Sequence, residues 1–166
     1  MTSRSQAQLR FLPVGLSLRG RGCLVVGGGS VATRKVISLI RAGATVTVVS
    51  PALGPELTDL ARGGRLRWLE QTFQKTHLAG AFLVVAATND EALNATIARQ
   101  ATEAGSLACD ASSAERSHVI FGALLNVEDA TVAVFTDGRD PAHARYLRDR
   151  IGNAMKDSCR PPEAES

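Results

Sequence analysis

Short apolar runs alternate with longer segments of helical periodicity along most of this chain. The first apolar run, 23–26, predicts a β-strand. The apolar positions that follow it are spaced like one face of a helix that ends near Gly43: Val31, Ala32, Val36, Leu39 and Ile40. Further strands are predicted at 45–49, 66–69, 82–86 and 106–109, and further helices at 53–62 and 91–104, the last with Asn89 or Asp90 as its N-cap. Strands that alternate with helices are typical of βαβ units, so the pattern predicts an α/β fold with a parallel sheet.

The pattern changes after Asp110. Two β-rich runs, 118–126 and 131–136, predict an antiparallel hairpin. Asp140-Pro141 is typical of an N-cap followed by proline at the first helical position, which predicts a helix over 142–155. We therefore expect three parts: a sheet domain over 11–114, a hairpin and helix over 115–156, and a disordered tail over 157–166.

Composition narrows the class of protein. The 166 residues are 45% hydrophobic and 21% charged, which is typical of one globular domain with or without a short appended element. The longest apolar runs, such as 81–87, are far shorter than the ~20 residues of a membrane-spanning helix, and no apolar segment of a secretory signal follows Arg10. We therefore expect a cytoplasmic protein without a membrane partner.

Cysteine usage and charge exclude further classes. Cys23, Cys109 and Cys159 are odd in number and form no C-x-x-C pair, so we expect neither a disulfide framework nor a metal site. The net charge of +3 is compatible with an anionic ligand. The aromatic residues are not interleaved with the arginines in a stacking pattern, and Trp68 and Tyr146 stand alone, so we expect no nucleic-acid partner.

Glycines 27–29 supply the strongest chemical signal. With Ala32 they form a G-x-G-x-x-A pattern directly after a predicted strand and at the start of a predicted helix. Gly27 permits a tight turn, Gly29 lets the backbone approach a pyrophosphate, and the helix N-terminus offers N–H groups to the phosphates, whereas Gly28 is interpreted only as added backbone freedom. The alternative is a turn that needs glycine for packing alone. The predicted cofactor-binding residues are Gly27, Gly28, Gly29, Ser30, Val31, Ser50, Pro51, Ala52, Ala87, Thr88 and Asn89.

The end of the second strand bears on the choice of cofactor. Many dinucleotide sites have an acidic residue there that holds the ribose hydroxyls, and this chain has Ser50. No arginine for a 2′-phosphate stands next to Ser50 either, which favours NAD over NADP. Asn89 and Asp90 lie where ligands bind in open α/β folds, although capping the next helix explains them equally well.

Several segments together resemble the precorrin-2 dehydrogenase family, which forms the N-terminal module of siroheme synthase. The resemblance covers about 11–151 and is carried by these segments: Phe11-Leu12-Pro13-Val14, Leu18-Arg19-Gly20-Arg21, the run from Val25 to Lys35 with its Arg34-Lys35 pair, 42–49, 86–90 with Asn94, and the hairpin with Asp140-Pro141 before an arginine-rich helix. It implies a Rossmann-like parallel sheet whose C-terminal hairpin and helix form a dimerisation element, and hence a homodimer.

The resemblance also implies an activity, the NAD-dependent oxidation of precorrin-2 to sirohydrochlorin in siroheme or related tetrapyrrole biosynthesis. The substrate is a polycarboxylate, and arginines bind carboxylates with two parallel hydrogen bonds. The substrate-binding candidates are Arg116, Arg139 and Arg145. The alternative for each of them is a solvated surface position.

The chain departs from the family pattern after the fifth strand. Matching the flanking residues puts Ser112 where the family has an aspartate that is the implied general base or metal-handling group. Asp110 and the titratable His118 are candidates to replace that carboxylate, so the predicted catalytic residues are Ser112, Asp110 and His118. Asp137 and Arg139 likewise stand in a turn where the family has small residues.

Two other functions stay open at this point. One is a bifunctional enzyme that also inserts iron or cobalt, a step that could instead belong to a separate chelatase. The other is a dimeric NAD-binding module that senses or regulates, like the ligand-binding domains of potassium transport systems.

Overall fold

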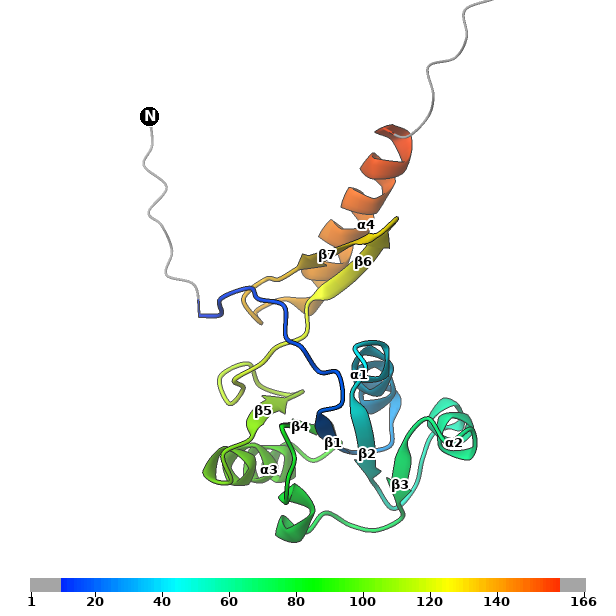
Figure 1. Cartoon of the computed structure of the whole chain (residues 1–166). Helices are drawn as coiled ribbons and strands as arrows, with labels where there is room; N and C mark the ends of the chain where they lie inside the picture. Colours follow the sequence, from blue (N-terminus) through cyan, green and yellow to red (C-terminus); the bar gives the residue numbers. More distant parts are fainter. Residues whose placement is uncertain (1–9, 159–166) are drawn as a thin grey trace, which may run out of the picture. The chain divides into compact units, whose positions relative to one another are not determined.

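The computed structural model describes residues 10–158 and divides the chain into two compact units (Figure 1). One unit comprises 14–120, and the other combines the segment that ends at Pro13 with the chain from Phe121 onward. Among the described residues, no helix is long and apolar enough to cross a membrane.

The 14–120 unit is a parallel sheet with helical connections. Its elements are β1 (Gly22–Val26), α1 (Ser30–Arg41), β2 (Thr45–Val49), α2 (Pro55–Arg62), β3 (Arg67–Leu69), the short 3-10 helix η1 (Lys75–Leu78), β4 (Leu83–Ala86), α3 (Glu91–Glu103) and β5 (Leu107–Asp110). The strands lie in the order β3-β2-β1-β4-β5 and all pair in parallel. The predicted α/β Rossmann-like fold is therefore confirmed, and η1 is the element that the pattern did not predict.

Both faces of this sheet are covered, as Figure 1 shows for α1 and α3 on opposite sides. Alternate β1 residues Leu24 and Val26 pack in a core cluster with Ile97, Ala98 and Ala101 of α3. α1 contacts β1 and β2 and buries Val36 and Leu39. Strand β4 is buried throughout, which explains its unbroken apolar run.

The order of the strands reverses at the centre of the sheet. β1 pairs with β2 on one side and with β4 on the other, so the loops after β1 and β4 begin beside each other at the carboxyl edge. In open α/β sheets this switch point is where ligands bind.

The other unit is an antiparallel hairpin, β6 (Ala123–Val127) and β7 (Ala130–Val134), packed against α4 (Pro141–Ser158). Asp140 caps α4, because its carboxylate accepts a hydrogen bond from the His143 N–H at 2.8 Å. The hairpin and the Asp140-Pro141 helix start are therefore confirmed.

Two boundaries in this region differ from the prediction. Residues 118–122 are not part of the hairpin, because the N–H groups of His118 and Val119 both bond to the Ala108 carbonyl and cover the edge of β5. Helix α4 continues to Ser158, so residues 157 and 158 are helical and not part of the predicted disordered tail. The rest of that predicted tail, 159–166, lies outside the described residues.

Candidate functional site

The glycine loop after β1 is shaped by close contacts with its neighbours. Gly27 has a φ of 122°, and a Cβ there would collide with the carbonyl of Ala87, which follows β4. The Ala87 N–H bonds to the Val26 carbonyl at 2.8 Å, so the two loops leave the sheet in contact. Gly27 is therefore required both by its backbone conformation and by the space available.

Gly28 has a definite steric role, which corrects its interpretation as added backbone freedom. A Cβ on Gly28 would overlap the Ala52 carbonyl oxygen and lie 2.8 Å from the Ser50 hydroxyl. The Gly28 carbonyl also accepts a hydrogen bond from the Gly54 N–H at 2.9 Å. The absence of a side chain lets the loop after β1 approach the loop after β2.

Gly29 differs from both, because an added Cβ would meet no atom within 4 Å. It is the N-cap of α1, so no side chain caps the first N–H groups of the helix, and the first turn contains no acidic residue. The first N–H groups of a helix and its dipole attract anions. The start of α1 thus offers space and positive potential together.

These loops enclose a pocket of about 400 Å³ at the carboxyl edge of the sheet. It brings together nine of the eleven predicted cofactor-binding residues: Gly27, Gly28, Gly29, Ser50, Pro51, Ala52, Ala87, Thr88 and Asn89. Ser30 and Val31 lie in the first turn of α1, are exposed, and do not line the pocket.

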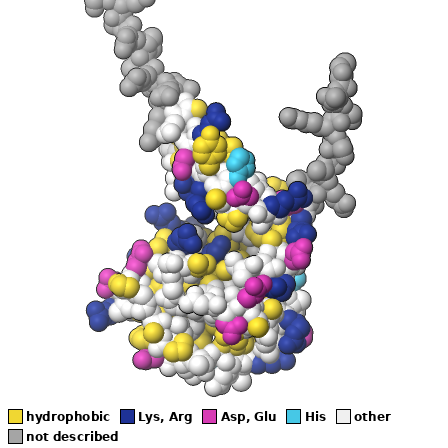
Figure 2. Space-filling view, turned by 180° about the vertical axis from the view of Figure 1, so that it is seen from behind, with side chains coloured by type: hydrophobic (Ala, Val, Ile, Leu, Met, Phe, Trp, Pro, Cys, Tyr) yellow, Lys and Arg dark blue, Asp and Glu magenta, His cyan; other side chains and the backbone are white. Residues whose placement is uncertain are grey.

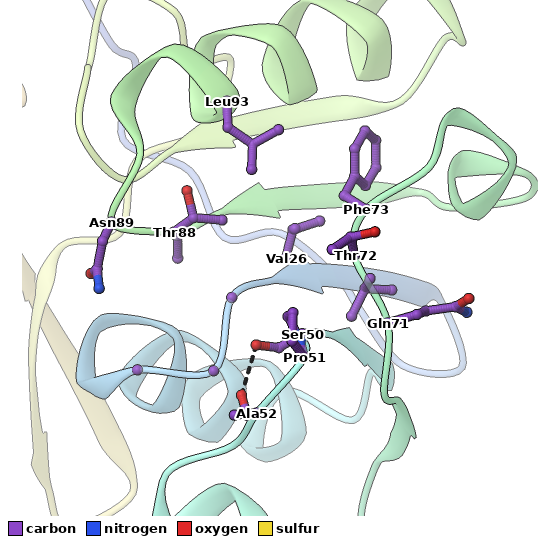
Figure 3. Close-up of a pocket in the computed structure, with 15 residues that line it drawn as sticks. Val26, Ser50, Pro51, Ala52, Gln71, Thr72, Phe73, Thr88, Asn89 and Leu93 are labelled. Carbon is purple, nitrogen blue, oxygen red and sulfur yellow. Dashed lines mark hydrogen bonds between the residues drawn. The ribbon is translucent and has the colours of Figure 1, made fainter.

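The pocket is also lined by six residues that the sequence pattern did not indicate: Val26, Val49, Gln71, Thr72, Phe73 and Leu93. Figure 3 shows Phe73 and Leu93 on one side of the pocket and the 50–52 loop on the other. Gln71–Phe73 follow β3, whose carboxyl end lies at the same edge as those of β1 and β2. The parallel arrangement predicted from the pattern was the signal that could have found them.

No residue that lines the pocket carries a charge. Ser50 is buried, its hydroxyl donates to the Ala52 carbonyl at 2.7 Å (Figure 3), and its own carbonyl accepts from the Trp68 indole N–H at 3.0 Å. The loop after β2 is held in place by these bonds. The pocket therefore offers apolar walls, neutral polar groups and the N-terminus of α1 to a ligand.

Next to this pocket, Asp110 lies at the end of β5 in a dense polar cluster. Its side chain is buried, and its backbone is in register with Ala86, one residue before the pocket residue Ala87. Oδ1 accepts the Ser112 hydroxyl at 2.5 Å and the Ser112 N–H at 2.8 Å, and Oδ2 accepts Arg116 Nε at 2.6 Å. Burial by itself would raise the pKa of Asp110, but these hydrogen bonds and the Arg116 charge outweigh it and lower the pKa below its ordinary value. Asp110 is a carboxylate at neutral pH.

Ser112, the second predicted catalytic residue, serves as a hydrogen-bond donor to that carboxylate. His118, the third, is exposed, and its Nδ1 accepts the Ala108 N–H at 3.3 Å. The structure thus brings Ser112 and Asp110 into contact, while His118 lies against the earlier part of β5. Among the described residues there is no group of three or more His, Cys, Asp or Glu side chains that could hold a metal ion.

The three candidate substrate arginines have different surroundings. Arg116 binds Asp110 through Nε, and its Nη2 lies 3.1 Å from Glu91 Oε1. Arg139 lies 3.4 Å from Asp137 and is largely exposed. Arg145 is exposed on α4. Arg116 belongs to the unit with the sheet and the other two to the hairpin unit.

Lys35, half of the basic pair that follows the glycines, is partly buried in α1. Burial lowers the pKa of its ammonium group. Burial also raises the pKa of Cys109 to about 11, so this thiol is neutral at physiological pH. Lys35 is therefore partly withdrawn from solvent, whereas Arg34 of the same pair is exposed.

Comparisons with known proteins agree with this architecture. Residues 14–123 match a family described as putative NAD(P)-binding proteins. The chain is 41% identical over 141 residues to siroheme synthase 1 of Aeromonas salmonicida, and 42% identical over 143 residues to siroheme synthase of Methylobacillus flagellatus. These matches cover 85% and 86% of this chain but only 30% and 31% of the relatives, so the chain spans about a third of their length.

Among solved structures, the chain is similar to SirC, a precorrin-2 dehydrogenase. The two share 30% sequence identity with a TM-score of 0.74, and the match covers 90% of this chain and 72% of that one. Unlike the match to the longer synthases, this one spans most of both chains.

Proposed function

Because the chain belongs to the family of putative NAD(P)-binding proteins, we propose that it binds NAD and uses it to oxidise precorrin-2 to sirohydrochlorin. The similarity to a precorrin-2 dehydrogenase along nearly the whole chain supports this substrate. The reaction removes two hydrogens from precorrin-2: bound NAD accepts one as a hydride, and the other leaves as a proton.

The observation that carries the proposal is the pocket over the N-terminus of α1. Gly29 leaves open space at the helix start, where a pyrophosphate would receive N–H bonds and a favourable dipole. Val26, Val49, Phe73 and Leu93 give apolar surface for the flat rings of a dinucleotide. No acidic side chain in the lining repels the phosphates, and no basic one favours an additional 2′-phosphate.

We assign Asp110 the part of the carboxylate that the family resemblance implies. Removal of a hydride leaves positive charge on the substrate until the proton departs, and a fixed carboxylate stabilises such charge. Asp110 is suited to this role because Arg116 and Ser112 keep it ionised and fixed in position beside the pocket loop. Its lowered pKa makes it a weak base, so its contribution is electrostatic.

Substrate carboxylates need cationic partners on the protein. Arg116 is held by both Asp110 and Glu91, whereas Arg139 is largely exposed beside one carboxylate and Arg145 is exposed; we therefore propose Arg139 and Arg145 as the residues that bind peripheral carboxylates of precorrin-2.

We further propose that the chain forms a homodimer through the hairpin unit. An isolated two-stranded sheet is marginally stable in water. α4 covers one face of β6 and β7, yet Leu124 of β6 remains 50% exposed. In Figure 2 hydrophobic side chains are visible on this unit beside basic ones. A second copy that packs on the exposed face of the hairpin would bury Leu124.

The test is anaerobic turnover of precorrin-2 with NAD and no added metal, followed by the absorbance of sirohydrochlorin. We expect product at a rate that depends on NAD concentration. Absence of product from a protein that still binds NAD would overturn the dehydrogenase and favour a regulatory NAD-binding module.

A further inference from the structure

One buried amide, Asn94 near the start of α3, uses its full hydrogen-bonding capacity. Its Oδ1 accepts the Thr88 N–H at 3.0 Å and the Thr88 hydroxyl at 2.7 Å. Its Nδ2 donates to the Thr88 carbonyl at 3.1 Å and to the Ser112 hydroxyl at 3.3 Å. An amide side chain has two donor hydrogens and one oxygen with two lone pairs, and all four positions are used here. Asn94 is 1% exposed, so a lost bond would not be replaced by water.

These bonds join two loops that leave neighbouring strands. Thr88 follows β4 and lines the cofactor pocket, whereas Ser112 follows β5 and does not line it. The hydrogen bonds all point the same way: Asn94 Nδ2 donates to the Ser112 hydroxyl oxygen, and the Ser112 hydroxyl donates to Asp110 Oδ1. Hydrogen bonds aligned in this way strengthen one another and end on the ionised carboxylate.

A second contact ties the same turn to α3. Arg116 donates to Asp110 Oδ2 and to Glu91 in the first turn of α3. The turn that carries Asp110 is therefore attached to α3 at a buried amide and at a more exposed ion pair. Because exposed ion pairs contribute little, the buried amide is the stronger determinant of its position.

We propose that Asn94 is a positioning residue that fixes the Asp110–Ser112 turn relative to the cofactor loop at Thr88. This inference rests on the proposed function, since the position of Asp110 matters for a reaction at the adjacent pocket. Asn94 touches neither cofactor nor substrate in this scheme. It acts through Thr88 on one side and through Ser112 on the other.

The first test compares turnover in single and double variants. In Asn94→Ala we expect kcat to fall by about 10- to 100-fold, as for a small misplacement of a reacting group. Ser112→Ala should lower kcat for the same reason, whereas Ser112→Thr, which keeps the hydroxyl at an exposed position, should restore it. The double variant Asn94→Ala/Ser112→Ala should be no slower than the slower single variant, because both changes break one chain of bonds.

Thr96→Ala is the matched control. Thr96 lies on the same helix, and its hydroxyl donates to the Ala92 carbonyl of α3, outside this chain of bonds. The kcat of the Thr96→Ala variant should therefore stay within about twofold of the parent value. Additive losses in the double variant, or a kcat unchanged in folded Asn94→Ala, would overturn the proposal and leave Asn94 a purely structural residue.

The second test does not depend on precorrin-2. The pKa of Asp110, followed by NMR of its side-chain carboxyl carbon, should rise in Ser112→Ala and in Asn94→Ala, because the donor to Oδ1 is lost in one and displaced in the other. It should not change in Thr96→Ala. If the parent protein does not turn over precorrin-2, the proposed function fails while this titration still decides the role of Asn94. An Asp110 pKa unaffected by Asn94→Ala contradicts the link.

Discussion

At the scale of single residues, three consecutive glycines serve three separate purposes. Gly27 adopts a backbone conformation that side chains disfavour, Gly28 leaves room for the Ala52 carbonyl, and Gly29 opens the pocket to a ligand. A substitution at each position therefore has a different consequence. A side chain at Gly28 should lower the stability of the folded state, whereas a side chain at Gly29 should change the affinity for the ligand.

We expect Gly29→Asp to abolish NAD binding without destabilising the protein. The φ of −87° and the space around Gly29 accept a side chain, and aspartate is a better N-cap than glycine by a few tenths of a kcal/mol. A carboxylate near a pyrophosphate costs several kcal/mol, so NAD affinity should fall by about a hundredfold or more. Titration calorimetry and thermal unfolding measure the two effects, with Gly29→Asn as the uncharged control. Unchanged NAD affinity in Gly29→Asp would mean that the glycine serves packing alone.

Gly28→Ala should behave in the opposite way. Its methyl group must displace the 50–52 loop, and overpacking of this kind costs about 1–3 kcal/mol of unfolding free energy. Gly15→Ala, where no atom lies within 4 Å of the added carbon, is the control and should change stability little. Urea unfolding would contradict the steric role if the two variants were equally stable.

Asp110 should make stability depend on pH in the acid range. Its pKa is lower in the folded chain than in the unfolded one, so its contribution is complete above a pH of about 4 and is lost as the pH falls through the folded value. At pH 7 we expect Asp110→Asn to cost about 1–3 kcal/mol. In urea unfolding from pH 7 to pH 2, the difference between parent and variant should shrink below about pH 4. A difference that stays constant over this range would contradict the lowered pKa.

At the scale of elements, the hairpin unit depends on a turn residue. Asp137 has a φ of 56°, and its Oδ1 accepts the N–H groups of both Arg10 and Phe11 at 3.0 Å. The acid that departs from the family pattern thus holds the N-terminal segment against the turn between β7 and α4. Its Oδ1 is committed to backbone N–H groups of the same unit, while Oδ2 lies near Arg139.

Asp137→Ala should therefore destabilise the hairpin unit by about 1–3 kcal/mol, since two donors lose their acceptor and alanine disfavours a positive φ. Asp137→Asn retains an oxygen acceptor and tolerates this conformation, so it should lose clearly less. Hydrogen exchange of the β6 and β7 amides reports the effect directly. Equal exchange rates in the two variants would show that the acceptor is not needed.

The elements themselves followed closely from the pattern, because each strand and helix repeats a local apolar spacing. The exceptions are η1 and residues 118–122. Residues 118–122 read as a strand because their composition is β-rich, but the backbone of His118 and Val119 is used to cover the β5 edge. Local spacing cannot show which strand edge needs covering.

At the scale of the whole molecule, the proposed homodimer can be tested through one exposed side chain. Leu124→Lys puts a charge on the exposed face of β6 and should convert the dimer to a monomer, measured by sedimentation velocity at micromolar concentration. Leu16→Lys changes an exposed leucine in the other unit and should leave the association state as it was. A parent protein that is already monomeric would overturn the dimer.

The sequence alone determined the order of the elements, the parallel sheet, the glycine loop and the α4 start, because these depend on local periodicity and on residues that few conformations accept. Tertiary structure alone decided which side chains meet. Gln71–Phe73 reach the pocket because β3 lies beside β2, and Gly28 is needed because the loop after β2 passes over it. Asn94 reaches the Ser112 hydroxyl because α3 packs against both β4 and β5. Such contacts join residues distant in the chain, and no local pattern encodes them.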